Sequence, residues 1–220
     1  MPLLKIIELN NYTQLLVWKI TETFDELLSS VELKNASLVR LESMKSESHQ
    51  RGFLSVRKLL MEAHYSDFDL YYDEFGKPHL KDGKHISISH SHGFSVIVVS
   101  DEKIGVDLEI IKDKILKLTP RFMDISHLKN LSKEDKLIKA TVVWGIKESV
   151  FKIKNEIGIS FKDHIFENDF MLEDKKCTVE LRIDNRVEHF NVVFDFIENY
   201  VFVCAFSSAP FGSESGEKKK

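Results

Sequence analysis

Strand-type and helix-type patterns alternate along this chain, and that alternation limits its possible folds more than any other feature. Apolar residues recur near a period of 3.6 over 23–46, 48–65 and 132–154, which predicts helices. Runs rich in Val, Ile and Phe predict strands over 85–91, 94–100, 104–111, 175–183, 186–197 and 200–207. Because both types are interspersed in both halves of the chain, we predict an α+β fold with largely antiparallel sheets.

Three local patterns add detail to this expectation. Residues 3–20 hold short apolar runs around a polar centre, which predicts pieces of strand and helix. Only three residues, 101–103, separate the predicted strands 94–100 and 104–111, so a hairpin is expected there. Ser132, with Asp135 three residues later, is a capping pattern that marks the start of the longest predicted helix.

The size and composition indicate an ordinary globular protein. The chain has 220 residues, 43% hydrophobic and 30% charged, enough for one large domain or two small ones. A soft boundary near residue 100 gives an N-terminal half, 1–100, and a C-terminal half, 101–211, and the small polar segment 212–220 is predicted to be a disordered tail. Two cysteines and the lack of a signal peptide or a long apolar run indicate a cytoplasmic protein that does not enter membranes.

The charge balance argues against one large class of ligand. The formal net charge is -4, so nonspecific attraction to nucleic acid is not indicated. An anionic ligand would therefore have to be bound by a local cluster of positive side chains.

Asp107 and Glu109 form the most informative local pattern. Side chains alternate faces along a strand, so these two carboxylates point the same way with Cα atoms roughly 6.5 to 7 Å apart. A hard divalent cation such as Mg²⁺ takes oxygen ligands and would relieve their repulsion. Gly105, just before them, would let a ligand or another backbone approach closely. A solvated strand face that carries acids remains the alternative.

The predicted helix 132–154 places chemically useful side chains along one face. Trp144, Glu148 and Lys152 follow one another at four-residue steps, and Lys147 lies close by. A surface ion pair between Glu148 and Lys152, with the tryptophan in the core, would explain the same pattern.

Positive residues gather in the N-terminal half. Arginine forks suit phosphate oxygens, and the candidates are Arg51, Arg57, Lys58, Lys77, Lys81 and Lys84. His90 ends a predicted strand between Ser89 and Ser91, an oxygen-rich setting that fits phosphate hydrogen bonding better than zinc ligation. Solvated surface charge and a structural histidine are the alternatives.

The chain resembles the 4'-phosphopantetheinyl transferase superfamily in four sequence blocks, which follow in the order FGKPHL, ISISHS, GVDLE and WGIKESVFK. Its long single-chain branch, the type that activates surfactin synthetase, is the closer match. The two most diagnostic motifs, G-x-D-x-E and W-x-x-K-E-S-x-x-K, are complete at 105–109 and 144–152. The similarity continues in GISF at 158–161 and more loosely in the R-x-F-L-x-x-R pattern at 51–57, so that it covers about residues 49–161.

The resemblance implies two similar α+β halves about a pseudo-twofold axis, with coenzyme A in the cleft between them. It also implies transfer of the 4'-phosphopantetheine group to a serine of an apo acyl or peptidyl carrier protein, with release of 3',5'-ADP. By the same resemblance, Mg²⁺ is bound by Asp107, Glu109 and Glu148. Glu148 or a metal-polarised water activates the serine, and Lys152 helps the departing group. The cofactor-binding residues that it implies are Arg51, Arg57, Lys77, Ser89, His90 and Lys152.

Two other classes of function stay open at this point. One is a non-catalytic binding module for coenzyme A or carrier proteins with the same fold, although a mere binder has no need of three carboxylates. The other is a metal-dependent nuclease or phosphohydrolase, against which the net negative charge counts. A monomer is expected, since two halves already form one cleft.

Overall fold

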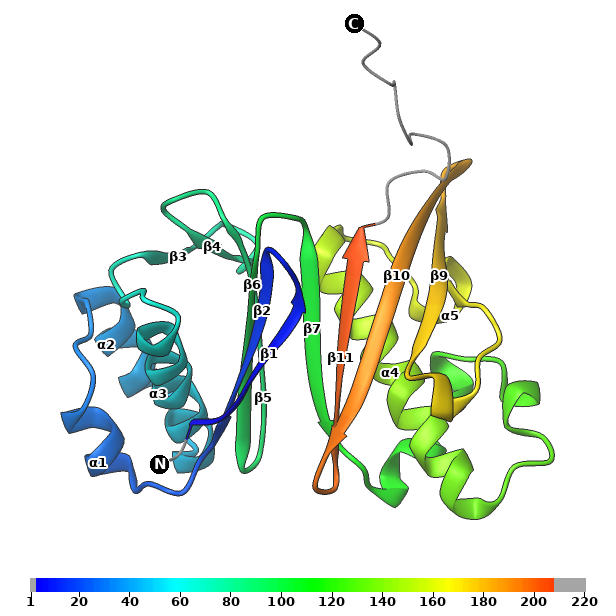
Figure 1. The fold of residues 1–220 in the computed structure, drawn as a ribbon, viewed down its shortest axis with the longest axis horizontal. Coiled ribbons are helices and arrows are strands. Elements are labelled where there is room, and N and C mark those ends of the chain that lie inside the picture. The colour runs from blue at the N-terminus through cyan, green and yellow to red at the C-terminus, as the bar shows by residue number, and fades with distance from the viewer. Residues whose placement is uncertain (1–2, 208–220) are drawn as a thin grey trace, which may run out of the picture.

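The computed structural model describes residues 3–207 and arranges them as two antiparallel sheets side by side, with helices on both outer flanks (Figure 1). Every strand pair in this range is antiparallel, so the predicted α+β class is confirmed. The predicted tail at 212–220 lies outside the described residues. Within residues 3–207 no helix is both long and apolar enough to cross a membrane.

The first sheet has the strand order β1-β2-β6-β5. Its strands are β1 (Leu3–Asn10), β2 (Thr13–Lys19), β5 (His85–Ser91) and β6 (Phe94–Ser100). The helices on its outer face are α1 (Phe24–Ser29), α2 (Asn35–Ser43) and α3 (Glu47–Glu62), and a small ribbon of β3 (Leu70–Tyr72) and β4 (Pro78–Leu80) lies beside it. Leu54, Leu59 and Ile97 lie in the apolar core between α3 and this sheet.

Two sequence-based predictions for this part were wrong. Residues 3–20 form the hairpin β1–β2 and contain no helical piece. The single helix predicted over 23–46 is divided into α1 and α2. Residues 30–34 separate the two helices, and Asp67 holds the start of α2 from outside by accepting hydrogen bonds from the Lys34 backbone N–H (3.0 Å) and the Ser37 hydroxyl (2.9 Å).

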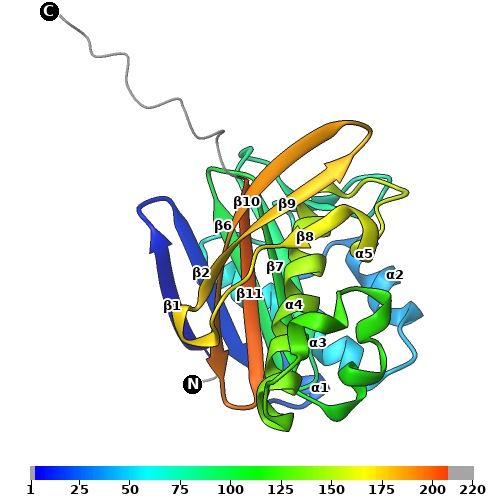
Figure 2. The ribbon, with the colours of Figure 1, turned by 90° about the vertical axis from the view of Figure 1, so that its right-hand side faces the viewer.

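The second sheet has the order β7-β11-β10-β9-β8. Its strands are β7 (Ile104–Ile110), β8 (Ile165–Glu167), β9 (Lys176–Ile183), β10 (Arg186–Ile197) and β11 (Tyr200–Ser207). Helix α4 (Lys133–Lys154) lies along its outer face, with the short helix α5 (Phe161–His164) beside β8 (Figure 2). Short 3-10 helices occupy Asp113–Lys117, Thr119–Arg121, Ile125–Leu128 and Leu172–Asp174. As predicted, the Ser132 hydroxyl caps α4 by accepting from the Asp135 N–H (3.0 Å).

The predicted hairpin between residues 94–100 and 104–111 was also wrong. β6 and β7 belong to different sheets, and β7 pairs with β11, about a hundred residues later. A three-residue turn suits either a hairpin or a step from one sheet to the next, so the turn alone could not decide.

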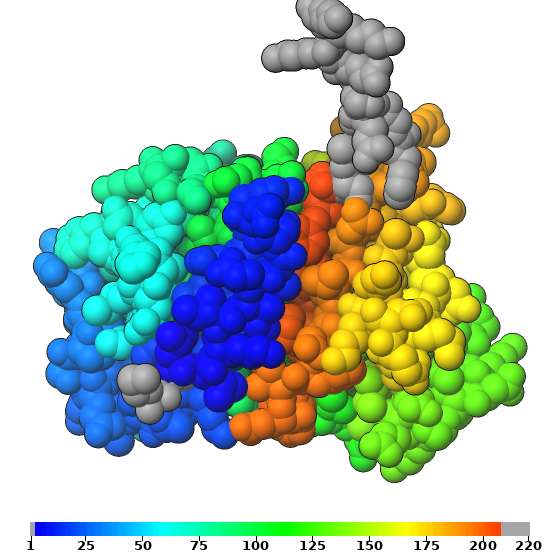
Figure 3. Space-filling model, viewed as in Figure 1, coloured from blue at the N-terminus to red at the C-terminus, as the bar shows by residue number. Residues whose placement is uncertain are grey.

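The inner faces of the two sheets share one apolar layer. Val17, Val96, Val106 and Phe202 are buried in it. At the front of the molecule the blue β1–β2 hairpin lies directly against the orange and red strands β10 and β11 (Figure 3). The step from β6 to β7 falls at residues 101–103, and the division into halves near residue 100 stays a prediction.

Candidate active site

Two glycines bring α4 unusually close to its sheet: Gly105 on β7 lies against the α4 backbone, and Gly145 on α4 lies against Val203 of β11. A Cβ atom on Gly105 would lie 1.9 Å from the Ser149 carbonyl oxygen, and one on Gly145 would lie 2.6 Å from Val203 Cγ2. Neither position tolerates a side chain without movement of the surrounding chain. The close approach expected from Gly105 is thus made to another backbone, and it brings the strand carboxylates against the helix.

Asp107 is buried, with 4% of its surface exposed. Its Oδ1 accepts hydrogen bonds from the Lys152 ammonium (2.8 Å) and the Ser89 hydroxyl (3.0 Å). Lys152 also donates to the Val106 carbonyl oxygen (2.8 Å). The second carboxylate oxygen, Oδ2, is buried without a hydrogen-bond partner among residues 3–207, and it faces α4 at Gly145. An unpaired buried acceptor of this kind calls for an explanation.

The two glutamates share the electrostatic environment of Asp107. Glu109, half-buried, accepts a hydrogen bond from Trp144 Nε1 (3.1 Å). Burial, followed by the charge of Asp107, raises its pKa to about 7. Burial and the same charge also raise the pKa of Glu148. Asp107 and Glu109 on β7 and Glu148 on α4 therefore lie in one partly desolvated region. This face of the strand is not simply a solvated surface.

The donor set of this region can be tested against a metal ion. Within residues 3–207, no three His, Cys, Asp or Glu side chains converge closely enough to hold a metal ion as they stand. The chemistry nevertheless fits a hard divalent cation, because the donors are carboxylates and one buried oxygen of Asp107 has no partner. In this arrangement the Lys152 ammonium provides the compensating charge.

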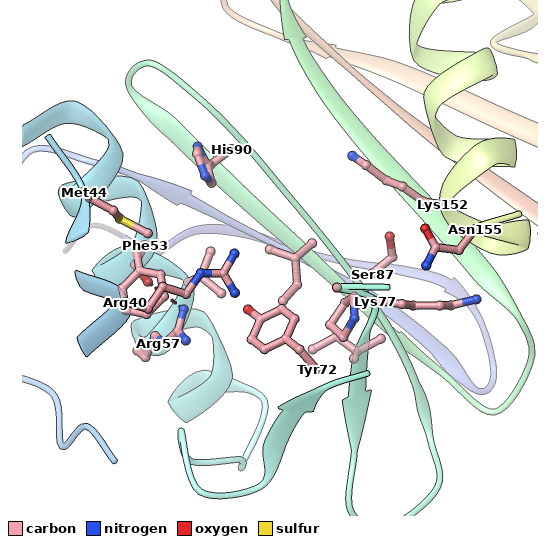
Figure 4. A pocket seen from close by; sticks show the side chains of 15 residues that line it. Arg40, Met44, Phe53, Arg57, Tyr72, Lys77, Ser87, His90, Lys152 and Asn155 are labelled. Carbon is pink, nitrogen blue, oxygen red and sulfur yellow. Dashed lines mark hydrogen bonds between the residues drawn. The ribbon is translucent and has the colours of Figure 1, made fainter. Parts of the chain in front are cut away.

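Figure 4 shows a cavity of about 270 Å³ that has Lys152, the partner of Asp107, among its lining residues. It is lined by side chains of α2, α3, the β3–β4 ribbon and β5, and by Lys152 and Asn155 at the end of α4. Its positive or ionisable lining residues are Arg40, Arg57, Lys77, His90 and Lys152. Lys152 belongs to both places, since it lines the cavity and bonds Asp107.

The predicted cofactor-binding residues do not all reach this cavity. Lys77, His90 and Lys152 are among its lining residues, and the Lys77 ammonium donates to the Ile153 carbonyl oxygen (2.5 Å). Arg51 is not among its lining residues, and its Nη2 donates to the Ile20 carbonyl oxygen (3.4 Å). Ser89 is also not among the lining residues, and its hydroxyl donates to Asp107.

Arg57 lines the cavity but is held by the protein itself. It is 3% exposed, and its Nε donates to Asp67 Oδ1 at 3.0 Å. Its other nitrogens donate to the Phe53 carbonyl oxygen and the Ser37 hydroxyl. The guanidinium therefore shapes the base of the cavity and has little left to offer a phosphate.

The His90 ring lies over Gly52 on α3, where a Cβ atom would come within 3.1 Å of it. Desolvation lowers the pKa of this imidazole, and the nearby charges of His49, Lys152 and Arg40 lower it further. A neutral imidazole still donates one hydrogen bond, and a bound anion would favour the charged form.

Sequence reasoning missed three residues of the cavity, Arg40, Tyr72 and Asn155. The Arg40 guanidinium lies over the Tyr72 ring, 4.6 Å from its centroid. Arg40 is an exposed arginine on a short helix and carries no local motif, so only the tertiary fold brings it here.

Lys147, in the second motif, points elsewhere. It is 2% exposed, and its ammonium binds Glu167 and the carbonyl oxygen of Ile165 on β8. The lysine therefore fastens α4 to the sheet.

No protein-family profile matches the chain. Among curated proteins it is 28% identical over 170 residues to the 4'-phosphopantetheinyl transferase ffp of Bacillus subtilis, which covers 73% of this chain and 75% of that protein. It is 29% identical over 83 residues to 4'-phosphopantetheinyl transferase gsp of Aneurinibacillus migulanus (36% of this chain, 35% of that protein). With 4'-phosphopantetheinyl transferase Sfp of Bacillus subtilis strain 168 it shares 28% identity over 118 residues (49% and 53%).

All three relatives are transferases by name, which supports the prediction of an enzyme of this kind. The resemblance drawn from the motifs is confirmed: this chain is similar to the 4'-phosphopantetheinyl transferase superfamily, in its long single-chain type.

Proposed function

We propose that this protein transfers the 4'-phosphopantetheine group of coenzyme A to a serine of an apo carrier protein and releases 3',5'-ADP. One observation carries the proposal. The Lys152 ammonium lines the basic cavity and lies 2.8 Å from Asp107 in the carboxylate cluster. A site for a polyanion thus adjoins a site suited to a divalent cation, as cleavage of a pyrophosphate requires.

In this proposal the cavity takes the nucleotide end of coenzyme A. Arg40 and His90 face it from different elements and supply hydrogen-bond donors for phosphate oxygens. The Lys77 ammonium donates to the Ile153 carbonyl oxygen (2.5 Å) and has two further N–H groups to offer. Arg57 keeps the cavity wall in shape through Asp67. Arg51 lies outside the cavity lining, so its contact with a phosphate would require its side chain to turn.

Asp107, Glu109 and Glu148 would hold Mg²⁺, which would supply charge neutralisation for the pyrophosphate. The candidate base is Glu148 or a water molecule that the cation would polarise. The serine oxygen forms a bond to the β-phosphorus, and the bond from that phosphorus to the bridging oxygen breaks. Lys152 balances the negative charge that develops on the bridging oxygen of the departing 3',5'-ADP.

The wider arrangement is part of the same proposal. We infer a cytoplasmic monomer whose halves are related by a pseudo-twofold axis, with coenzyme A between them and no role for nucleic acid or membranes. In support, each half carries a long helix, α3 or α4, on the outer face of an antiparallel sheet. Cys177 and Cys204 are both free thiols, which suits a reducing compartment.

Mass spectrometry of a carrier protein tests the function directly. The chain is mixed with coenzyme A, Mg²⁺ and an apo acyl or peptidyl carrier, and the carrier is expected to gain the mass of one phosphopantetheine. A carrier whose acceptor serine is replaced by alanine is the control, and a chelator in excess over Mg²⁺ should stop the reaction.

The same mixture separates the alternatives. Coenzyme A that binds without any carrier modification would indicate a binding module. Coenzyme A that is cleaved without a carrier would indicate a phosphohydrolase. Comparison of fatty-acid, polyketide and nonribosomal-peptide carriers then identifies the acceptor.

A further inference from the structure

The two sheets meet at their edges through serine side chains. β5 is the last strand of the first sheet and β7 the first strand of the second. The backbone N–H groups of Val106 and Leu108 donate to the hydroxyls of Ser87 (3.0 Å) and Ser89 (3.2 Å). Residue numbers rise in the same direction on both strands, so β5 and β7 run parallel here. Serine oxygens thus satisfy N–H groups that an edge strand would otherwise leave unpaired.

Ser89 does one thing more than Ser87. Its hydroxyl accepts from the Leu108 N–H and donates to Asp107 Oδ1 at 3.0 Å. Because a hydroxyl has a single hydrogen, the incoming N–H favours the orientation in which that hydrogen points at the carboxylate. Ser87 has the same kind of backbone partner but no carboxylate.

The donors around Asp107 are distributed unevenly. Ser89 and Lys152 both bind Oδ1, and Oδ2 has no partner although it is buried. A carboxylate held by one oxygen offers the other in a fixed direction. The Lys152 side chain is 27% exposed and lines the cavity, so a bound polyanion can draw it away. Ser89 is buried between β5 and β7, so a ligand in the cavity cannot draw its hydroxyl away from Asp107 in the same way.

We propose that Ser89 is a positioning residue, which fixes the rotamer of Asp107 so that Oδ2 is presented to a divalent cation. The inference rests on the proposed function, and it differs from the contact with coenzyme A that the family resemblance implies for Ser89. Outer hydrogen bonds of this type orient metal ligands, and their removal lowers metal affinity about 10- to 100-fold.

Ser89→Ala and Ser87→Ala form a matched pair for the test. Each variant loses one hydroxyl that bonds the β7 backbone, so both should lower the melting temperature, and Ser89→Ala should lower it somewhat more. Only Ser89→Ala also loses the bond to Asp107. The full-length chain is titrated with Mn²⁺ by calorimetry without coenzyme A, and transfer to the carrier is measured over a range of Mg²⁺ concentrations.

For Ser89→Ala we expect a Kd for Mn²⁺ about 10-fold or more higher, and a matching rise in the Mg²⁺ concentration that gives half-maximal transfer. At saturating Mg²⁺ most of kcat should return. Ser87→Ala should leave the Kd for Mn²⁺ unchanged.

An equal change in the Kd for Mn²⁺ in the two variants, or no change in Ser89→Ala, would overturn the role assigned to Ser89. The proposed function would still stand in that case if the wild-type chain modified the carrier. A wild-type chain that neither binds Mn²⁺ nor modifies a carrier would overturn both.

Discussion

The Trp144 indole donates a hydrogen bond of 3.1 Å to Glu109 Oε1 and so joins the two sequence motifs across the contact between α4 and β7. The ring is held in turn by Phe122 and Phe161, whose ring centroids lie 5.2 and 5.5 Å away. The tryptophan is therefore more than a core aromatic, because its polar edge fixes a carboxylate of the candidate metal site.

Trp144→Phe should separate these two roles. Phenylalanine keeps most of the contact with the neighbouring rings but cannot donate to Glu109. We expect transfer at limiting Mg²⁺ to fall about 10-fold, with little change in the free energy of unfolding. The control is Trp18→Phe, since the Trp18 indole nitrogen is buried in the described structure without a partner. Equal losses of activity in both variants would argue against a special role for the Glu109 contact.

Asp107→Ala should abolish carrier modification and leave the fold intact. The change removes a buried charge, and Lys152, partly exposed, keeps its bond to the Val106 carbonyl oxygen. Circular dichroism and a thermal melt would check the fold, and mass spectrometry the transfer. Retained modification of the carrier at the wild-type rate would refute the assigned role.

Glu148→Gln tests the helix carboxylate separately. Glutamine is similar in shape but can neither take the serine proton nor neutralise a cation. We expect turnover to fall about 100-fold or more, within the usual range for loss of a general base. An unchanged turnover would reduce Glu148 to the charge partner of Lys152.

Gly105→Ala should damage the fold as well as the activity. The new Cβ would lie 1.9 Å from a carbonyl oxygen of α4, and a backbone atom cannot turn aside as a flexible side chain can. We expect a loss of about 3 kcal/mol in the free energy of unfolding, measured with denaturant. Gly93→Ala is the control, because its Cβ would meet only the Tyr200 hydroxyl at 3.8 Å, and a change within about 0.5 kcal/mol is expected.

Lys147→Met should lower stability, although the lysine belongs to a diagnostic motif. Its removal leaves the buried Glu167 carboxylate without its ammonium partner and with only the long contact to His127 Nδ1 (3.4 Å), and the loss of such a buried ion pair typically costs about 3 to 5 kcal/mol. The double variant Lys147→Met/Glu167→Leu should recover much of that loss. A Lys147→Met protein of normal stability but without turnover would instead point to a chemical role.

Arg40→Ala should weaken the binding of coenzyme A. The arginine lines the cavity, and one lost charge-assisted hydrogen bond corresponds to a KM about 10-fold higher, with kcat nearly unchanged. Arg186→Ala, an exposed arginine on β10, is the control. Equal KM values for Arg40→Ala and wild type would remove Arg40 from the proposed binding site.

Local patterns were enough to predict much of the fold. Helix α4 was predicted almost to the residue from its apolar period and the Ser132 cap, and β9, β10 and β11 from their Val-rich and Phe-rich runs. Features that depend on partners far along the chain were predicted wrongly. The turn at 101–103 does not reveal that β7 pairs with β11. Asp67, which binds the start of α2, lies about thirty residues further along the chain than that helix.

The site shows the same limit. Asp107 and Glu109 were placed on one face by strand alternation alone, and both face α4. A positive charge in the sequence does not say whether its partner is a ligand or the protein. Asp67 binds Arg57, and Glu167 binds Lys147. Arg40, which no sequence pattern indicated, lines the cavity.

The oxygen of Asp107 that no donor reaches has a consequence for how this sequence can vary. A buried acceptor without a partner costs the empty protein about 1 to 3 kcal/mol. Selection for heat resistance alone would therefore do nothing to keep this oxygen, because the bonds to Lys152 and Ser89 that stabilise Asp107 in the ligand-free state use only Oδ1. Libraries built to make this protein more robust should be screened by turnover, since a thermostable clone can be an inert one.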